Sequence, residues 1–325
     1  MRREGLRRGL LRGLILLLIW TTAAAEMTDS PAEETWTMDE RGFLISGPGE
    51  EYILEDEENG LWQYARKDLA ITVRRFREEV PVKGKKKARI REYCVADIHA
   101  SETSPLGAVM SQPTKKRPAG YKLVSPELLL ETHPCIFALS DDLYGIRLQK
   151  YQYDGIVIRN GEILATKTRD SSKKRPWPNL DTLAVYADGS MKTYVCDALT
   201  AEEYLGQGAV QVFSFGPVLI SEGKISETVL NPKYYPYNEP RVAIGMAEPW
   251  HYIAVLVRGR PSSTYAGVHL DWLAEKMAEY GCTEALNLDG GLTATMAFMG
   301  KIILTGGGKL RSQGSLITFG ESSAP

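Results

Sequence analysis

The chain consists of many short apolar runs separated by turn residues, a pattern that restricts it to folds dominated by short β-strands. The clearest turn is Asn160-Gly161, which lies between apolar runs at 155–158 and 162–164 and favours a tight hairpin. A second hairpin is predicted across residues 187–190. No segment recurs at a fixed period, so the pattern argues against a solenoid or a propeller.

The remaining elements follow from periodicity and from helix boundary signals. A helix is predicted from Ser125 as N-cap to the residue before Pro134, and a second helix over 266–280, ended by Gly281. Further strands are predicted at 69–73, 93–100, 135–139, 210–215, 242–245, 252–257, 285–288, 295–298, 301–304 and 315–319. Together these elements predict an α+β fold, in which a large mixed or antiparallel β-sheet core carries a few helices on its faces.

The N-terminus has the pattern of a secretory signal. Five arginines precede an apolar stretch at 13–20, and Ala23-Ala24-Ala25 follows as a small-residue cleavage site. The uncharged run is shorter than the roughly 20 residues that a spanning helix needs. We therefore expect a signal peptide at 1–25, an acidic flexible lead-in at 26–59 and one domain at 60–325. The protein is expected to be secreted or extracytoplasmic, associated with the membrane if the signal is not cleaved.

Composition excludes several functional classes. The 325 residues carry 39 basic and 41 acidic side chains, and five of the basic ones lie in the signal, so the body is acidic and nucleic acid is not an expected partner. The four cysteines lack zinc-site spacing. Burial as free thiols is the simpler interpretation, although export would permit a disulfide. The acids are too scattered to predict a metal, and no cofactor is expected.

Three basic clusters are expected in loops, where solvated surface is the ordinary interpretation. If they gather on one face, they would attract an anionic cell-wall polymer despite the acidic total. The clusters are Lys83 to Lys87, Lys115 to Arg117 and Lys173 to Arg175.

The segment from Ala285 to Met296 contains the best candidate site. Side chains alternate along a strand, so Asn287 and Asp289 share one face while the intervening leucines enter the core. Gly290 and Gly291 then remove side-chain bulk beside Asp289, which permits a ligand or another backbone to approach closely. An ordinary Asp-Gly turn is the structural alternative.

Several motifs occur in order along the chain and give this segment a context. They are Phe213 to Lys224, Pro240 to Gly245, Val257 to Arg260, Tyr265 to Gly267, and Ala285 to Gly291. The series resembles the phosphodiester glycosidase family, which includes the enzyme that uncovers mannose 6-phosphate by removing N-acetylglucosamine from a phosphodiester. The resemblance runs from about residue 93 to residue 319.

The resemblance implies cleavage of a sugar C1–O bond whose leaving group is a phosphate ester. The expected substrate is a glycosyl-phosphate or a phosphoglycan, and we expect it in an envelope glycan or a related phosphoglycan. The resemblance also implies Asp289 as a catalytic carboxylate and Arg241 and Arg260 as phosphate ligands, since guanidinium groups bind phosphate in bidentate fashion. The other expected substrate-binding residues are Asn287, Gly290, Gly291, Thr293 and Gly216. The chain departs from the family pattern at Leu292, and Ser140 and Asp141 occupy positions where the family commonly has Asn-Gly.

Glycosidases generally use a second carboxylate. Asp97 is one candidate, because strand alternation places it on the face opposite Cys94 and Ala96, although a solvent-facing side chain is the ordinary alternative. Asp142 is the other catalytic candidate, and Glu284 is weaker. Two rivals to an enzyme stay open: a glycan-binding protein that has lost hydrolysis, and a structural envelope protein anchored by its basic loops.

Overall fold

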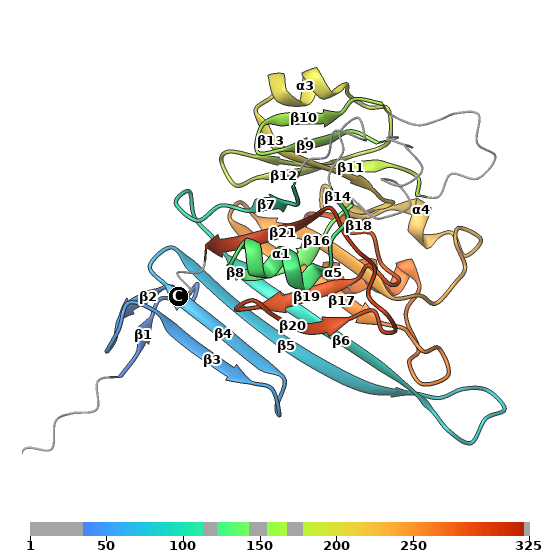
Figure 1. The fold of residues 1–325 in the computed structure, drawn as a ribbon. Helices are drawn as coiled ribbons and strands as arrows, with labels where there is room; N and C mark the ends of the chain where they lie inside the picture. The colour runs from blue at the N-terminus through green and yellow to red at the C-terminus, as the bar shows by residue number, and fades with distance from the viewer. Residues whose placement is uncertain (1–34, 113–121, 143–154, 168–177, 322–325) are drawn as a thin grey trace, which may run out of the picture. The chain divides into compact units, whose positions relative to one another are not determined.

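A computed structural model describes residues 35–112, 122–142, 155–167 and 178–321 (Figure 1). The predicted signal peptide and the basic clusters at 115–117 and 173–175 lie outside the described residues. Within the described part of the chain, every pairing between named strands is antiparallel.

The largest sheet has nine strands in the order β15-β14-β18-β16-β17-β6-β5-β4-β3. Its long neighbouring strands β5 and β6 are prominent in Figure 1. In chain order the bounds are β3 Tyr52–Asp56, β4 Leu61–Arg66, β5 Leu69–Val80, β6 Arg89–His99, β14 Val218–Ser221, β15 Lys224–Ile225, β16 Arg241–Glu248, β17 His251–Arg258 and β18 Glu284–Leu288.

Two five-stranded sheets and one small strand pair complete the β-structure. The first, in the order β20-β19-β8-β21-β7, consists of β7 Gly107–Met110, β8 Cys135–Ser140, β19 Thr295–Phe298, β20 Lys301–Thr305 and β21 Ser315–Glu321. The second, in the order β10-β9-β13-β11-β12, consists of β9 Val157–Arg159, β10 Glu162–Ala165, β11 Asp181–Tyr186, β12 Met191–Tyr194 and β13 Ala209–Phe215. The small pair is β1 Thr37–Met38 with β2 Leu44–Ser46.

Four helices lie in the described part of the chain, and each covers a sheet face or a strand edge. They are α1 Pro126–Thr132, α3 Ala201–Gly206, α4 Glu227–Leu230 and α5 Leu270–Glu279. The main core lies between the nine-stranded sheet and the sheet of β8, where Leu286 and Leu288 meet Phe137 and Leu139 in one buried cluster. The opposite face of the nine-stranded sheet packs against α5 through Leu273.

The α+β prediction is therefore confirmed, and the sheets are antiparallel rather than mixed. Asn160 and Gly161 form the predicted β9-β10 turn, both with positive φ, and Ser125 caps α1 through its hydroxyl. Helix α5 begins four residues later than predicted, because the backbone of Val268 pairs with Glu239 instead of continuing a helix.

The prediction of a flexible lead-in at 26–59 is wrong for its described part, which contains β1, β2 and β3. The acidic side chains of this segment obscure an alternation in β3, where Tyr52 and Leu54 are less exposed than Ile53 between them. The ring of Tyr52 also meets Trp36 edge to face, with 5.5 Å between centroids. A partly buried face is thus enough to add β3 to the edge of the large sheet.

Three of the cysteines, Cys94, Cys135 and Cys282, are buried thiols outside any disulfide. Burial raises the pKa of each to about 12, so they stay protonated and unreactive at neutral pH. Among the described helices, none combines the length and the apolar character that a membrane span requires.

Candidate active site

The candidate site forms where strands of all three large sheets end close together. Strand β18 ends just before Asp289, and β8 ends just before Asp141. The backbone N–H of Asp289 donates a hydrogen bond to the carbonyl oxygen of Asp141 at 3.3 Å, which joins the nine-stranded sheet to the sheet of β8. Side chains from these strand ends therefore face a common region.

The two glycines after Asp289 are required by the packing of the loop. A Cβ on Gly290 would lie 2.2 Å from the carbonyl oxygen of Pro240, and that oxygen accepts a hydrogen bond from the N–H of Gly291 at 3.1 Å. Gly291 also has a φ of +61°, which favours glycine. The Asp-Gly-Gly sequence thus lets the loop rest on the backbone at the start of β16, and it leaves Asp289 only 8% exposed.

Burial strongly changes the acidity of Asp289. Desolvation is the main cause of a pKa raised to about 7, and the carboxylates of Asp141 and Asp142 raise it further, against the opposing effects of the Thr293 hydroxyl and the Arg311 guanidinium. Its Oδ2 atom has no hydrogen-bond partner among the described residues. A carboxyl with this pKa exchanges a proton near neutral pH, as an acid–base catalyst must.

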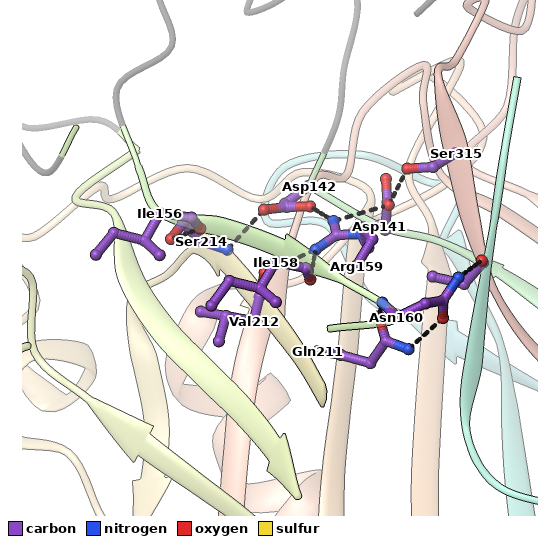
Figure 2. Close-up of polar contacts among 11 residues, drawn as sticks. Asp141, Asp142, Ile156, Ile158, Arg159, Asn160, Gln211, Val212, Ser214 and Ser315 are labelled. Atoms are coloured by element: carbon purple, nitrogen blue, oxygen red, sulfur yellow. Dashed lines mark hydrogen bonds and ion pairs between the residues drawn. The ribbon is translucent and has the colours of Figure 1, made fainter. Parts of the chain in front are cut away.

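Asp141, Asp142 and Arg159 form a buried ion cluster (Figure 2). It lies close to Asp289, whose N–H donates to the carbonyl oxygen of Asp141. Arg159, at the end of β9, directs one terminal nitrogen to both carboxylates, at 3.1 Å from Asp141 and in close contact with Asp142. Asp142 also accepts a hydrogen bond from the backbone N–H of Ser214 at 2.6 Å, and Asp141 accepts one from the Ser315 hydroxyl. All three charged side chains are at most 2% exposed. The cluster therefore links β8, β9, β13 and β21 through charge.

The guanidinium of Arg159 is held from its other side as well. Its second terminal nitrogen donates to the carbonyl oxygen of Val212 at 2.6 Å, and its central carbon lies 4.2 Å from the ring centre of Phe213. Such a cation has no freedom to swing toward a ligand. Its position fixes the two aspartates near Asp289 and keeps their negative charge inside the protein.

Thr293 and Arg311 form the other side of the site. A terminal nitrogen of Arg311 lies 3.4 Å from the Thr293 hydroxyl oxygen. The side-chain amide of Gln313 donates a hydrogen bond to the carbonyl oxygen of Thr293 at 2.9 Å. Arg311 is half-buried and forms no ion pair with a carboxylate among the described residues. It is therefore a cation beside Asp289 that remains available to an anionic ligand.

Asn287 and Gly216 face each other, and their contacts are structural. The Asn287 side-chain amide donates to the Gly216 carbonyl oxygen at 2.8 Å, and the Gly216 N–H donates to the Asn287 carbonyl oxygen at 3.0 Å. A Cβ on Gly216 would lie 2.2 Å from the side-chain oxygen of Asn179, so only glycine fits. This pair fastens β18 to the end of β13. The Oδ1 atom of Asn287 is buried and lacks a partner among the described residues.

The two arginines predicted to bind phosphate form hydrogen bonds and an ion pair with other residues of the protein. Arg241 is 3% exposed and donates to the carbonyl oxygens of Val268 and Tyr237, at 3.3 and 3.0 Å. Arg260 forms an ion pair with Glu239 at 2.9 Å. Main-chain hydrogen bonds join the motif that contains Arg260 to the loop at Gly306. The carbonyl oxygen of Gly306 accepts them from the N–H groups of residues 259 and 260. The role of Arg241 and Arg260 as phosphate ligands stays a prediction.

Asp97 is not part of this site. It lies on β6, three strands away from β18 in the sheet order, which is about 14 Å at the usual strand spacing. The strand register places Asp97 in one row with Ile253, Gly245 and Ala285, which is four residues before Asp289 in the chain. Of the two predicted partners for Asp289, only Asp142 is brought close to it, and Glu284 is occupied by Thr193 and the N–H of Glu222.

Sequence reasoning missed Arg159 and Arg311 as members of the site. Arg159 lies in the β9-β10 hairpin, where the sequence indicated only the end of a strand before a turn. The available signal was the Asp141-Asp142 pair directly after a fully apolar strand, because two buried carboxylates require a buried cation. Nothing in the sequence identifies which of the arginines supplies it.

Comparison with known proteins identifies the family and the fold of the chain. Residues 133–318, more than half of the chain, match the sequence profile of the phosphodiester glycosidase family. A prophage-derived uncharacterized protein of Bacillus subtilis (strain 168), YomE, is 26% identical over 151 residues, which cover 44% of this chain and 23% of that protein, so the match spans less than a quarter of the relative.

Among solved structures, the zebrafish N-acetylglucosamine-1-phosphodiester alpha-N-acetylglucosaminidase catalytic domain, auto-inhibited by its pro-peptide, superposes with a TM-score of 0.57. The two chains are 17% identical, and the match covers 85% of this chain and 90% of the other. That likeness shows a shared fold, and the profile match shows the family. The chain belongs to the phosphodiester glycosidase family.

Proposed function

We propose that the protein is a hydrolase that cleaves the bond between a sugar C1 and the oxygen of a phosphate ester. The observation that carries this proposal is the Asp289 carboxyl, which has a pKa of about 7 and lies beside the available cation of Arg311. Family membership supplies the reaction class, and the carboxyl and the guanidinium supply the two groups that such a reaction needs.

The chemistry of the leaving group assigns the role of Asp289. A phosphate ester is a weak base and departs with little help from an acid, so the more demanding task is to stabilise the positive charge at C1 and to activate water or form a glycosyl intermediate. Asp289 performs that task in its ionised form. Asp142 is the second carboxylate, and its negative charge increases the basicity of Asp289 while Arg159 holds it in place.

The charges of the site suit a substrate that becomes positive at C1 and carries its phosphate to one side. When Asp289 ionises, it adds a negative charge beside C1, where positive charge develops in the transition state. The phosphate is then held at the edge of the site by Arg311, which lies near Asp289 yet forms no ion pair with a described carboxylate.

The pH profile tests the role of Asp289. We expect kcat/KM for an N-acetylglucosamine-1-phosphodiester, the substrate class named for the zebrafish relative, to increase as the pH rises through about 7 and then to level off. The ionised carboxylate is the reactive form, so activity follows its population. Initial rates measured from about pH 5 to about pH 9 give the curve. If kcat/KM instead falls as the pH rises through about 7, Asp289 acts as a proton donor.

Arg311 is expected to contribute to substrate binding. Replacing Arg311 with alanine should lower kcat/KM by about 10- to 100-fold, the cost of losing a charge-assisted hydrogen bond, and Arg311→Lys should recover part of it. Lys309→Ala is the matched control, because Lys309 is an exposed cation two residues away. Equal losses from the two alanine variants would remove Arg311 from the phosphate site.

The substrate source and the location of the protein follow from the N-terminal pattern. We propose export by the signal at 1–25 and action on an envelope phosphoglycan, with the exposed loop of Lys83 to Lys87 between β5 and β6 as an additional contact for an anionic polymer. N-terminal sequencing of protein recovered from outside the cytoplasm should begin at Glu26. Sugar release from wall fragments distinguishes an enzyme from a glycan-binding protein on the same scaffold, which would bind those fragments without releasing a product.

A further inference from the structure

Two histidines and an aspartate gather on the nine-stranded sheet, away from Asp289. His251, at the start of β17, is directly opposite His99, at the end of β6. Asp97 precedes His99 by two residues, so strand alternation places both on one face. Three side chains that commonly bind metals thus project from adjacent positions on two neighbouring strands, whose backbone pairing fixes their spacing.

The distances among these side chains are those of ligands around one small metal ion. The Asp97 Oδ1 atom lies 2.8 Å from His251 Nε2 and 3.6 Å from His99 Nε2, and the ligand atoms of all three residues lie within 4.8 Å of one another. Around a tetrahedral zinc ion with bonds of about 2.0–2.1 Å, neighbouring ligand atoms are roughly 3.3 Å apart. The two separations from Asp97, 2.8 and 3.6 Å, lie on either side of that value.

A hydrogen-bonded cluster without metal satisfies these groups less well. One carboxylate oxygen faces ring nitrogens of both histidines, and the two imidazoles are stacked with 3.9 Å between their centroids. If both rings carried a proton on Nε2, two donors would share one acceptor, and if either did not, a lone pair would face the carboxylate. A divalent cation accepts a lone pair from each ring and charge from Asp97 at once, after the two rings turn out of the stacked arrangement so that both in-plane lone pairs point at one position.

The cluster opens into a cavity. This cavity has a volume of about 350 Å³ and is lined by Asp97 and His99 together with Glu40, Arg41 and Arg74. The Asp97 side chain is 41% exposed, and the two histidine side chains are about one-fifth exposed. An ion bound here would therefore have an open coordination position on the cavity side, where the two arginines favour an anion or a water that carries negative charge.

We propose that Asp97, His99 and His251 bind a divalent transition metal ion of the zinc class, with a fourth position open to water or a small anion. Among the described residues, this is the only group of three such side chains with convergent ligand atoms. The site is separate from the Asp289 site, because β16 lies between β17 and β18 in the sheet and β6 is one strand farther away. Metal binding here does not depend on whether the proposed hydrolase activity is correct.

The test is metal titration of the full chain, purified without a polyhistidine tag and stripped with a chelator. Isothermal titration with Zn²⁺ should give one equivalent bound per chain, and Co²⁺ should give the visible absorption of a low-coordinate nitrogen and oxygen site. His99→Ala and His251→Ala should each weaken binding by more than the roughly 10- to 100-fold that loss of an outer hydrogen-bond partner costs. Asp97→Asn should weaken it too, since it removes the ligand charge.

His269→Gln is the matched control, because His269 is one of only four histidines and lies at the start of α5, outside the cluster. Asp289→Asn should also bind one equivalent of Zn²⁺, which separates this site from catalysis. Circular dichroism of each metal-free variant checks that the fold is retained. If the wild-type chain takes up no Zn²⁺ at micromolar concentrations, or if the two alanine variants bind as the wild type does, the site does not exist.

Discussion

Replacing Asp289 with asparagine is expected to lower the turnover of a sugar-1-phosphodiester by about 10²- to 10⁴-fold, the usual contribution of a positioned acid–base group. Asparagine keeps the shape of the side chain but neither ionises nor accepts a proton, so it removes the proposed chemistry while it preserves the loop on Pro240. Turnover numbers at saturating substrate, measured above pH 7, give the comparison. Glu275→Gln, which neutralises an exposed carboxylate on α5, is the control.

The same substitution should stabilise the protein. Folding raises the pKa of Asp289 from 3.8 to about 7, so between these two values the folded state holds a proton that the unfolded state has lost. The free energy of unfolding therefore falls as the pH rises from about 4 to about 7 and is constant above that. The full shift corresponds to about 4 kcal/mol, and the asparagine variant avoids that loss because an amide does not ionise.

Thermal unfolding at two pH values checks this expectation. At about pH 8 the melting temperature of Asp289→Asn should exceed that of the wild type by several degrees, and near pH 4 the two should coincide. Glu275→Gln should show no such pH-dependent gain. A variant that loses activity and also loses stability at pH 8 would mean that the ionised carboxylate is well stabilised in the fold, which contradicts a raised pKa.

Local signals explain why much of the fold could be predicted from sequence. The β9-β10 hairpin follows from Asn160-Gly161, and the start of α1 follows from Ser125-Pro126, because in both cases the determining contacts lie within a few residues. Asp289 could be predicted as a site residue in the same way, because side chains alternate along its strand and two glycines follow it. The edge strand β3 was not, because its stabilising contacts are with β4 and Trp36 and its own composition is acidic.

Pairing between distant segments explains what sequence could not supply. Asp97 and His251 are 154 positions apart, and they meet only because β6 and β17 pair in one register, which a shift of one residue would abolish. Arg159 reaches Asp141 and Asp142 only because β9 and β8 belong to different sheets that converge at one end. The choice between Asp97 and Asp142 as partners of Asp289 was likewise a question of which strands are neighbours.

The Arg159 cluster gives the largest expected effect on stability. Arg159→Met removes a buried cation and keeps most of its volume, so Asp141 and Asp142 stay buried without the cation that pairs with both of them. Breaking a buried ion pair from one side costs about 3–5 kcal/mol, a large part of the stability of an ordinary domain. Urea denaturation at neutral pH should therefore show a midpoint far below that of the wild type, or no folded protein at all.

Two companion variants separate the charge effect from the loss of packing. Arg260→Met removes an arginine whose side chain is 41% exposed, so breaking its pair with Glu239 should cost no more than about 1 kcal/mol. Adding Asp142→Asn to Arg159→Met removes one of the two carboxylate charges that Arg159 paired with, and it should restore part of the lost stability. Lowering the pH should do the same, because it protonates the carboxylates. If the double variant is no more stable than Arg159→Met alone at any pH, the cluster acts through the shape and hydrogen bonds of Arg159, and its charge does not hold the aspartates beside Asp289.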